Sequence, residues 1–352
     1  MKITPTRPAL KPFACPECLR RGHLLSQLAP YLEKVAIGRS GVPVHDLLCL
    51  DNEDLVRSVA PDVAERVLGE VGAIAEGELT NRLELGGCWA CCRHDPLYPE
   101  SLWEAADAPW CLYGRGDPAL LVDLAEKSGV VTIVGARRAS SYGRDVARSL
   151  GRDLAAAGIT VLSGMAFGVD ACAHRGALDA GRTVAVLGCG ADITYPAAHR
   201  SLWRRVQENG IVLSELPPGT GAWRWSFPAR NRIMAAIAGM TVVVEAVERS
   251  GSLLTAQIAA NLGREVGAVP GPVSSRTSAG PNDLLADGAS LIRNADDVLG
   301  VPLRCESVIR APQPSDPLQL SRDAQVIIGE DRVPTDVLRD LVSTYGNREA
   351  NQ

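Results

Sequence analysis

The chain has 352 residues, of which 46% are hydrophobic and 22% are charged, a composition typical of a globular protein with one large core and one or two small modules. No apolar run reaches the roughly 18–20 residues of a spanning helix, and residues 1–12 lack the apolar centre of a signal peptide. We therefore expect a cytoplasmic protein without membrane contact. A net charge of -5 argues against coating of DNA by bulk electrostatics, whereas a local basic surface remains compatible with it.

Ten cysteines in a chain expected in the cytoplasm indicate free thiols or a metal site rather than a disulfide framework. They include a C-x-x-C pair near the start and a C-x-x-C-C-x-H run much later in the chain. Two explanations stay open: reduced thiols, or a structural tetrahedral zinc site with Cys15, Cys18, Cys88 and Cys91 as candidate ligands. We expect no other cofactor.

Residues 1–80 predict a helical module, because apolar side chains recur there at intervals of three and four residues. Nothing in this segment has catalytic spacing, which favours a docking or interaction role. Residues 81–128 form a transition of short extended pieces bounded by turns. We expect them to lead into the main sheet or to add an edge strand to it.

From residue 130 to about residue 300, short apolar runs alternate with helical patterns that end in glycine. This alternation predicts a parallel sheet with helices on both faces. The expected fold class is α/β: an extended Rossmann-like, doubly wound, mostly parallel sheet over residues 81–300, preceded by a small all-helical N-terminal domain. The expected strands are 130–134, 159–162, 183–187, 211–213, 241–245, 265–269 and 290–292, and the expected helices are 144–157, 169–180, 198–209, 231–238 and 253–262.

Beyond residue 300 the alternation ends. Residues 301–320 are expected to be a linker, because they contain the proline-rich stretch 311–317. Residues 321–352 are expected to form a short C-terminal tail, in which 321–328 and 334–345 are predicted as two short helices.

Residues 130–143 join a buried strand to a helix through a glycine turn. Ser140 and Ser141 can cap that helix, and Arg137 and Arg138 precede them. A helix N-terminus offers unpaired N–H groups and a partial positive charge, so this turn suits a phosphate group. The two adjacent arginines favour a nucleic-acid backbone over a free dinucleotide.

The spacings of common nucleotide-binding and hydrolase motifs are missing. Gly135 has no second glycine two positions later, the stretch GCG at 188–190 lacks the third glycine, and no G-x-x-x-x-G-K-[ST] sequence occurs. Hydride transfer and P-loop chemistry are therefore disfavoured. No nucleophile elbow or metal-ligand set accompanies four further polar residues, which we interpret as structural: Asp170, His174, Glu215 and Glu245.

Residues 223–232 interleave aromatic side chains with arginines in a chain whose aromatic content is only 4%. Aromatic faces stack on bases and guanidinium groups pair with phosphates, as single-stranded nucleic acid requires. A second interpretation stays open, in which the aromatics belong to the core and the arginines are solvated. The residues concerned are Trp223, Arg224, Trp225, Phe227, Arg230 and Arg232.

Short motifs follow the predicted strands in order: VGARR at 134–138, SGMAFGVD at 163–170, AVLGCG at 185–190, YP at 195–196, SE at 214–215, FPARNR at 227–232, SGSLLT at 250–255 and VPG at 269–271. Together they resemble the bacterial DNA-processing protein A family (DprA, also called Smf). The resemblance covers residues 95–300 and is carried by the order of the motifs rather than by any single one.

The resemblance implies a protein without established catalytic activity that binds and protects single-stranded DNA and helps to load the RecA recombinase during natural transformation. It also implies a homodimer and a sterile-alpha-motif-like fold for residues 1–80. Many members end in a winged-helix domain, but residues 321–352 are short for one and lack a clear helix-turn-helix pattern, so a reduced remnant is the alternative for the tail.

Motif position implies the DNA-binding residues, with Arg137 as the DNA-contacting arginine of the family. The full set is Arg137, Arg138, Ser140, Gly143, Ser163, Gly164, Gly168, Gly188, Gly190, Arg230, Asn231, Arg232, Ser250, Gly251 and Thr255.

Two other functions stay open. An enzyme of the phosphoribohydrolase type would bind a nucleoside monophosphate near Gly135 and Gly164 and cleave it with Glu215 or Glu245. The chain lacks the P-G-G-x-G-T-x-x-E stretch typical of that class. A non-catalytic adaptor acting through residues 1–80 alone would leave the arginine–aromatic segment unexplained.

Overall fold

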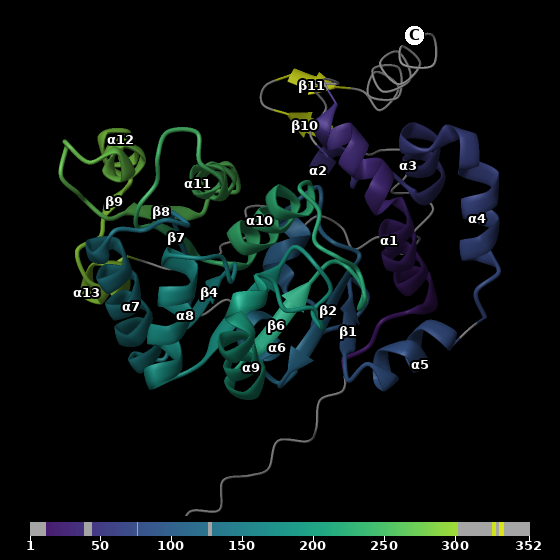
Figure 1. Cartoon of the computed structure of the whole chain (residues 1–352), viewed down its shortest axis with the longest axis horizontal. Helices are drawn as coiled ribbons and strands as arrows, with labels where there is room; N and C mark the ends of the chain where they lie inside the picture. The colour runs from purple at the N-terminus through teal and green to yellow at the C-terminus, as the bar shows by residue number, and fades with distance from the viewer. Residues whose placement is uncertain are drawn as a thin grey trace, which may run out of the picture.

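The computed structural model describes residues 12–38, 44–75, 77–125, 129–301, 326–328 and 331–333. Within these ranges the N-terminal helices lie beside a large sheet that has helices on both faces, as Figure 1 shows. None of the helices described is both long and apolar enough to span a bilayer.

The N-terminal helices pack around one apolar core. The Asp51 side chain caps the third of them by accepting a hydrogen bond from the N–H of Asp54 (2.8 Å). Their core contains Leu28 and Leu55, and Trp225 from the sheet region also packs into it. The all-helical start of the chain is confirmed, and its division from the sheet at residue 80 stays a prediction. The helices are α1 (Pro16–Ile37), α2 (Val44–Leu47), α3 (Asn52–Val59), α4 (Ala64–Gly72) and α5 (Glu78–Leu85), with a short 3₁₀ helix η1 (Pro61–Val63) before α4.

One mixed sheet of the described residues has the strand order β1-β2-β6-β5-β4-β3-β7-β8-β9. Strands β3 to β9 pair in parallel, whereas β2 is antiparallel to β6 and β1 is antiparallel to β2. The transition segment thus adds edge strands, as expected. The strands are β1 (Trp89–Cys92), β2 (Cys111–Gly116), β3 (Val130–Val134), β4 (Thr160–Ser163), β5 (Thr183–Leu187), β6 (Ile211–Ser214), β7 (Met240–Val243), β8 (Glu265–Ala268) and β9 (Ser290–Leu291).

Helices cover both faces of this sheet, because side chains of a buried strand alternate between two cores. Val131 and Ile133 of β3 face one core, and Val130 and Val134 face the other. The first face carries α7 (Ser141–Ala156), α8 (Val169–Ala180), α9 (Arg200–Asn209) and α13 (Ala295–Leu299). The second face carries α6 (Leu120–Ala125), α10 (Ser226–Ile237), α11 (Gly251–Asn261) and α12 (Ala279–Ala286), and short 3₁₀ helices are η2 (Glu100–Glu104), η3 (Ala197–His199) and η4 (Arg276–Ser278).

Most predicted elements of the sheet region agree with the structure to within one or two residues. The exceptions are α7, which begins at Ser141 rather than at residue 144, and α10, which begins at Ser226 rather than at residue 231. Pro228 lies in the first turn of α10, where a proline is tolerated because its missing N–H leaves no bond unmade.

The predicted helix over residues 321–328 is wrong where the structure describes it. Val326–Ile328 is a strand, β10, which pairs antiparallel with β11 (Asp331–Val333). The β-branched residues of this stretch favour a strand. Residues 302–325, which include most of the expected linker, and the predicted helix at 334–345 lie outside the described residues.

Candidate nucleic-acid interface

The loops that follow the parallel strands lie together at the carboxyl edge of the sheet. The chain leaves β3 through α7 on one face and reaches β7, on the other side of β3, through α10 on the opposite face. Strand order therefore reverses between β3 and β7, and open α/β sheets bind ligands at such a point. The predicted residues after β3 and β7 lie at this reversal.

The turn between β3 and α7 is braced by a carboxylate. The Ser140 hydroxyl accepts a hydrogen bond from the N–H of Gly143 (3.1 Å), which makes Ser140 the cap of α7. Glu245 accepts hydrogen bonds from the Ser140 N–H (2.8 Å) and hydroxyl (2.6 Å). The interpretation of Glu245 as a brace is confirmed. Because this carboxylate occupies the helix N-terminus, the arginines rather than the helix end are left for an external anion.

Arg137 and Arg138 are both exposed in this turn. The Arg137 guanidinium lies 5.4 Å from the centre of the Phe227 ring, and the Phe227 ring lies 5.3 Å from that of Tyr195. These three side chains, which we call the Arg–aromatic row, come from the loop after β3, the start of α10 and the loop after β5. A cation over one aromatic ring, with a second ring next to it, can pair with a phosphate while bases stack on the rings.

The loop after β4 passes close to the Arg137 backbone. Gly168 has a φ of +76°, and a Cβ there would lie 2.7 Å from the Arg137 carbonyl oxygen, so this position requires glycine. The Asp170 carboxylate accepts hydrogen bonds from the N–H groups of Gly164 (3.2 Å) and Ala166 (3.3 Å). Asp170 therefore holds the loop in place.

His174 and Ser163 complete the framework below this loop. His174 is fully buried, and its Nδ1 lies 2.8 Å from the Thr183 hydroxyl. Burial lowers the pKa of His174 to about 3, so its imidazole is neutral at pH 7. The Ser163 hydroxyl donates to the carbonyl of Ile133 (2.6 Å). The contacts of Asp170 and His174 agree with their interpretation as structural residues.

Arg230 and Asn231 are buried and link β5 to the segments that follow β4 and β7. Arg230 donates to the Gly164 carbonyl (2.7 Å), to a carbonyl of β5 and to the Asn231 side chain (2.9 Å). Asn231 donates in turn to the Gly251 carbonyl (3.1 Å). Burial lowers the pKa of Arg230, and the negative charge of Asp170 opposes this shift. Both residues position the loops from beneath rather than face solvent.

Arg232 and Trp225 do not reach this surface. Arg232, only 3% exposed, forms ion pairs with Glu215 (2.7 Å) and Asp107 (2.9 Å). The Trp225 indole is buried in the core of the N-terminal helices, where its N–H donates to the Ala29 carbonyl (3.1 Å). The prediction that they pair or stack with nucleic acid is therefore wrong, because α10 buries them against other elements. Glu215 acts as the brace that its sequence position suggested.

The remaining predicted residues divide by accessibility. Gly188 and Gly190 are buried in the loop after β5, where the Gly190 N–H donates to a carbonyl of the loop after β6 (2.8 Å). Thr255 is buried, and its hydroxyl donates to the Gly251 carbonyl (3.2 Å). Ser250 and Gly251, at the start of α11, are accessible to a ligand.

Two exposed aromatic residues at this edge were not among the predicted site residues. Tyr195 is 41% exposed and Phe167 is 45% exposed. The Phe167 ring packs edge-on against His199 at 4.6 Å. A signal was available, because the chain has only three phenylalanines and two of them, Phe167 and Phe227, lie in motifs at strand ends.

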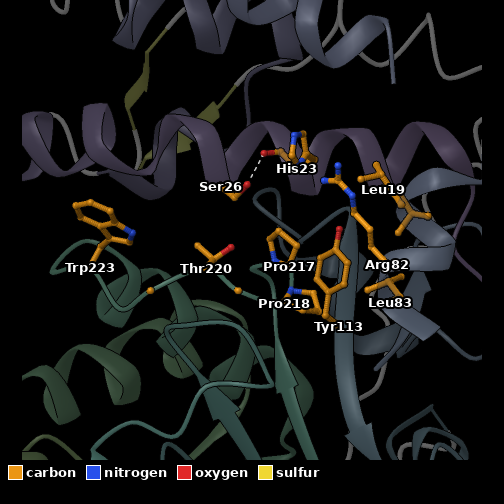
Figure 2. Close-up of a pocket in the computed structure, with 13 residues that line it drawn as sticks. Leu19, His23, Ser26, Arg82, Leu83, Tyr113, Pro217, Pro218, Thr220 and Trp223 are labelled. Carbon is orange, nitrogen blue, oxygen red and sulfur yellow. Dashed lines mark hydrogen bonds between the residues drawn. The ribbon is translucent and has the colours of Figure 1, made fainter. Parts of the chain in front are cut away.

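A cavity of about 460 Å³ lies between α1 and the loop after β6. Figure 2 shows Pro217, Thr220 and Trp223 of that loop below α1, with His23 and Ser26 above them. The residues that line it include His23, Arg82 and Tyr113 but no carboxylate. On the same side, Glu33 of α1 accepts hydrogen bonds from the backbone N–H groups of Arg224 (2.8 Å) and Trp225 (3.3 Å).

A separate cluster joins the start of α1 to the end of β1, and its ligand atoms lie within 4.8 Å of one another: Cys15, Cys18, Cys92 and His94. The predicted pairing with Cys88 and Cys91 is wrong. Cys91 points into the opposite core because side chains alternate along a strand, and the Cys88 sulfur accepts from Arg115 (3.3 Å). The cluster has donor types that could hold a metal ion.

The family model for DNA recombination-mediator protein A matches residues 89–301. The chain belongs to this family. The matched span runs from β1 to the end of α13 and contains the whole Arg–aromatic row.

Relatives of known sequence support the assignment. A DNA processing protein from Mycobacterium tuberculosis is 48% identical over 193 residues, which are 54% of this chain and 49% of the relative. DNA processing protein DprA from Streptococcus pneumoniae is 39% identical over 210 residues, which are 58% of this chain and 71% of the relative. The chain thus spans about half the length of the M. tuberculosis relative.

Two solved structures are similar in fold. DprA from S. pneumoniae gives a TM-score of 0.64 at 31% identity, with 80% of this chain and 95% of that chain covered. DNA processing protein A from Helicobacter pylori, described for its mode of single-stranded DNA binding, gives 0.53 at 30% identity, with 57% and 91% covered. The predicted Rossmann-like fold is confirmed.

Proposed function

We propose that this chain binds single-stranded DNA across the carboxyl edge of the sheet. Arg137 and Arg138 would contact phosphates, and bases would stack on Phe227, Tyr195 and Phe167. The Arg–aromatic row is the observation that supports this function, because it places the exposed Arg137 guanidinium over the Phe227 ring, which in turn lies tilted against the Tyr195 ring. The H. pylori relative, described for single-stranded DNA binding, gives independent support.

The exposed aromatic faces favour a single strand over a duplex. Bases in a duplex are stacked on one another, whereas the bases of a single strand are free to stack on side chains. The net charge of -5 is a property of the whole chain, whereas a phosphate at the turn after β3 would meet two exposed arginines, Arg137 and Arg138.

We also propose a non-catalytic role in the cytoplasm: protection of incoming single-stranded DNA and loading of RecA recombinase by a homodimer during transformation. Glu215 is engaged with Arg232 and Glu245 with Ser140. These contacts disfavour the phosphoribohydrolase alternative, which needs one of the two carboxylates free. A RecA strand-exchange assay on DNA coated with single-strand-binding protein, together with sedimentation of the purified chain, tests the loading and dimer proposals.

The direct test is fluorescence anisotropy of a labelled oligonucleotide, single-stranded and double-stranded, across a salt series. We expect tighter binding of the single strand, with a slope of log K against log salt of about -0.7 for each phosphate contact. Arg137→Glu should weaken single-strand binding at least about tenfold, because it replaces attraction by repulsion at the phosphate.

Arg152→Glu is the matched control, since Arg152 is exposed near the C-terminal end of α7, the helix that follows the turn. It makes the same change of charge and should leave affinity within about twofold. Equal affinity for duplex and single strand, or equal losses in the two variants, would refute the proposed surface.

A further inference from the structure

The cluster of Cys15, Cys18, Cys92 and His94 has the dimensions of a tetrahedral metal site. The Nδ1 atom of His94 lies 3.4 Å from the sulfur of Cys15, 3.6 Å from that of Cys18 and 3.8 Å from that of Cys92. A tetrahedral zinc ion, with Zn–S of about 2.3 Å and Zn–N of about 2.1 Å, separates its sulfur and nitrogen ligands by about 3.6 Å. The observed separations centre on this value.

Hydrogen bonding alone does not explain this arrangement. One imidazole nitrogen carries either one N–H or one lone pair, so it can make one good hydrogen bond and not three. A cation at the centre would satisfy the nitrogen and all three sulfurs at once. We propose that these four residues bind one Zn²⁺ ion as a closed structural site.

The donor set selects the metal. Three thiolates and one imidazole are soft and borderline ligands, which disfavours magnesium and calcium, and the tetrahedral arrangement is the one that zinc adopts in structural sites. All four positions are filled by the protein, so no position is left open for a catalytic water.

Two elements position the four residues: the N-terminus of α1, and the end of β1 with the turn that follows it. Cys15 stands at the N-cap position of α1 and Cys18 lies one turn later, so their side chains share one face of the helix. Cys92 ends β1, and His94 lies in the turn that follows. The N–H of Cys15 points to the Cys92 sulfur (3.4 Å), a contact of the kind that supports metal-bound thiolates.

The ion would fasten two distant parts of the chain. Cys15 and Cys92 are 77 residues apart, and the Cys92 N–H already donates to the Phe13 carbonyl (3.0 Å). Closing this long loop would hold the start of α1 against edge strand β1, and the free energy of metal binding would add to the stability of that junction.

The test uses the full chain, purified under reducing conditions without a metal-affinity tag. We expect about one zinc ion per chain by mass spectrometry of the metal, released when the thiols are modified. Replacement by Co²⁺ should give the intense visible absorption of a tetrahedral thiolate site, a readout that needs no variant.

Two variants locate the ion. His94→Ala, at an exposed side chain, should weaken zinc binding at least about tenfold, whereas Cys88→Ser, which removes a nearby thiol outside the cluster, should retain the metal. Absence of zinc together with absence of the cobalt absorption would overturn the proposal. So would equal loss of zinc in the two variants, or a disulfide within the cluster in the freshly purified chain.

Discussion

Two arginine-bearing segments of the carboxyl edge use the same side chain in opposite ways. In the turn after β3, Arg137 and Arg138 are exposed, and Arg137 lies on an aromatic ring. In α10, Arg230 and Arg232 are 7% and 3% exposed and are engaged with carbonyl and carboxylate oxygens of the protein. The turn lies beyond the end of the sheet, whereas α10 packs on its face. Burial, and not residue type, separates the arginines available to a ligand from those that hold the framework.

The largest expected effect is on stability and concerns the buried arginines of α10. Arg232→Ala would leave the buried Glu215 and the half-buried Asp107 without their partner, which should lower the free energy of unfolding by about 3–5 kcal/mol. Arg137→Ala, at an exposed side chain, should change it by less than about 0.5 kcal/mol. Urea denaturation of both variants measures this, and similar losses in the two would contradict the distinction.

A smaller effect on stability concerns the buried His174, which lies beneath the loop after β4. The pKa of His174 is about 3 in the folded chain against an ordinary value of 6.5, so only the unfolded chain binds a proton between these values. The stabilisation is present above about pH 6.5 and is lost as pH falls toward 3, by about 2 kcal/mol between pH 7 and pH 5. His174→Gln should flatten this part of the stability curve. An unchanged slope of unfolding free energy against pH in that variant would disprove the assignment.

The smallest expected effect is on DNA affinity and concerns the exposed aromatic side chains near Arg137. Tyr195→Leu removes one stacking face and should weaken single-strand binding by about 1 kcal/mol, the lower end for one stacked base, because Phe227 already covers part of the ring. Tyr31→Leu, on α1, is the control and should leave affinity unchanged. Anisotropy at fixed salt measures both, and a loss common to both variants would point to a general change of the fold.

Much of the fold could be predicted from the sequence, because strands buried on both faces are continuous apolar runs. Glycines that end helices marked the limits of α8, which agrees with its predicted range. The cap at Ser140 was predictable for the same local reason, since a serine before a helix satisfies a free N–H group.

The candidate site was less predictable, because burial depends on contacts between distant residues. Arg232 and Trp225 stand in a basic aromatic stretch that looks exposed by composition, yet their partners Glu215 and Ala29 lie 17 and 196 residues away. Two of the four residues of the cysteine cluster were predicted, because the others depend on contacts between distant parts of the chain. The C-x-x-C spacing identified Cys15 and Cys18, but only the end of β1 decides which later thiol faces them.

The Trp225–Ala29 contact makes the position of the Arg–aromatic row depend on the N-terminal helices. Glu33 and Ala29 of α1 hold the segment that leads directly into Phe227. A fragment that begins at residue 89, where the family match begins, would expose the Trp225 indole. It would also lose the contacts that hold the segment before Phe227 in place. Truncation at residue 89 would therefore alter the surface proposed to bind DNA without removing any of its residues.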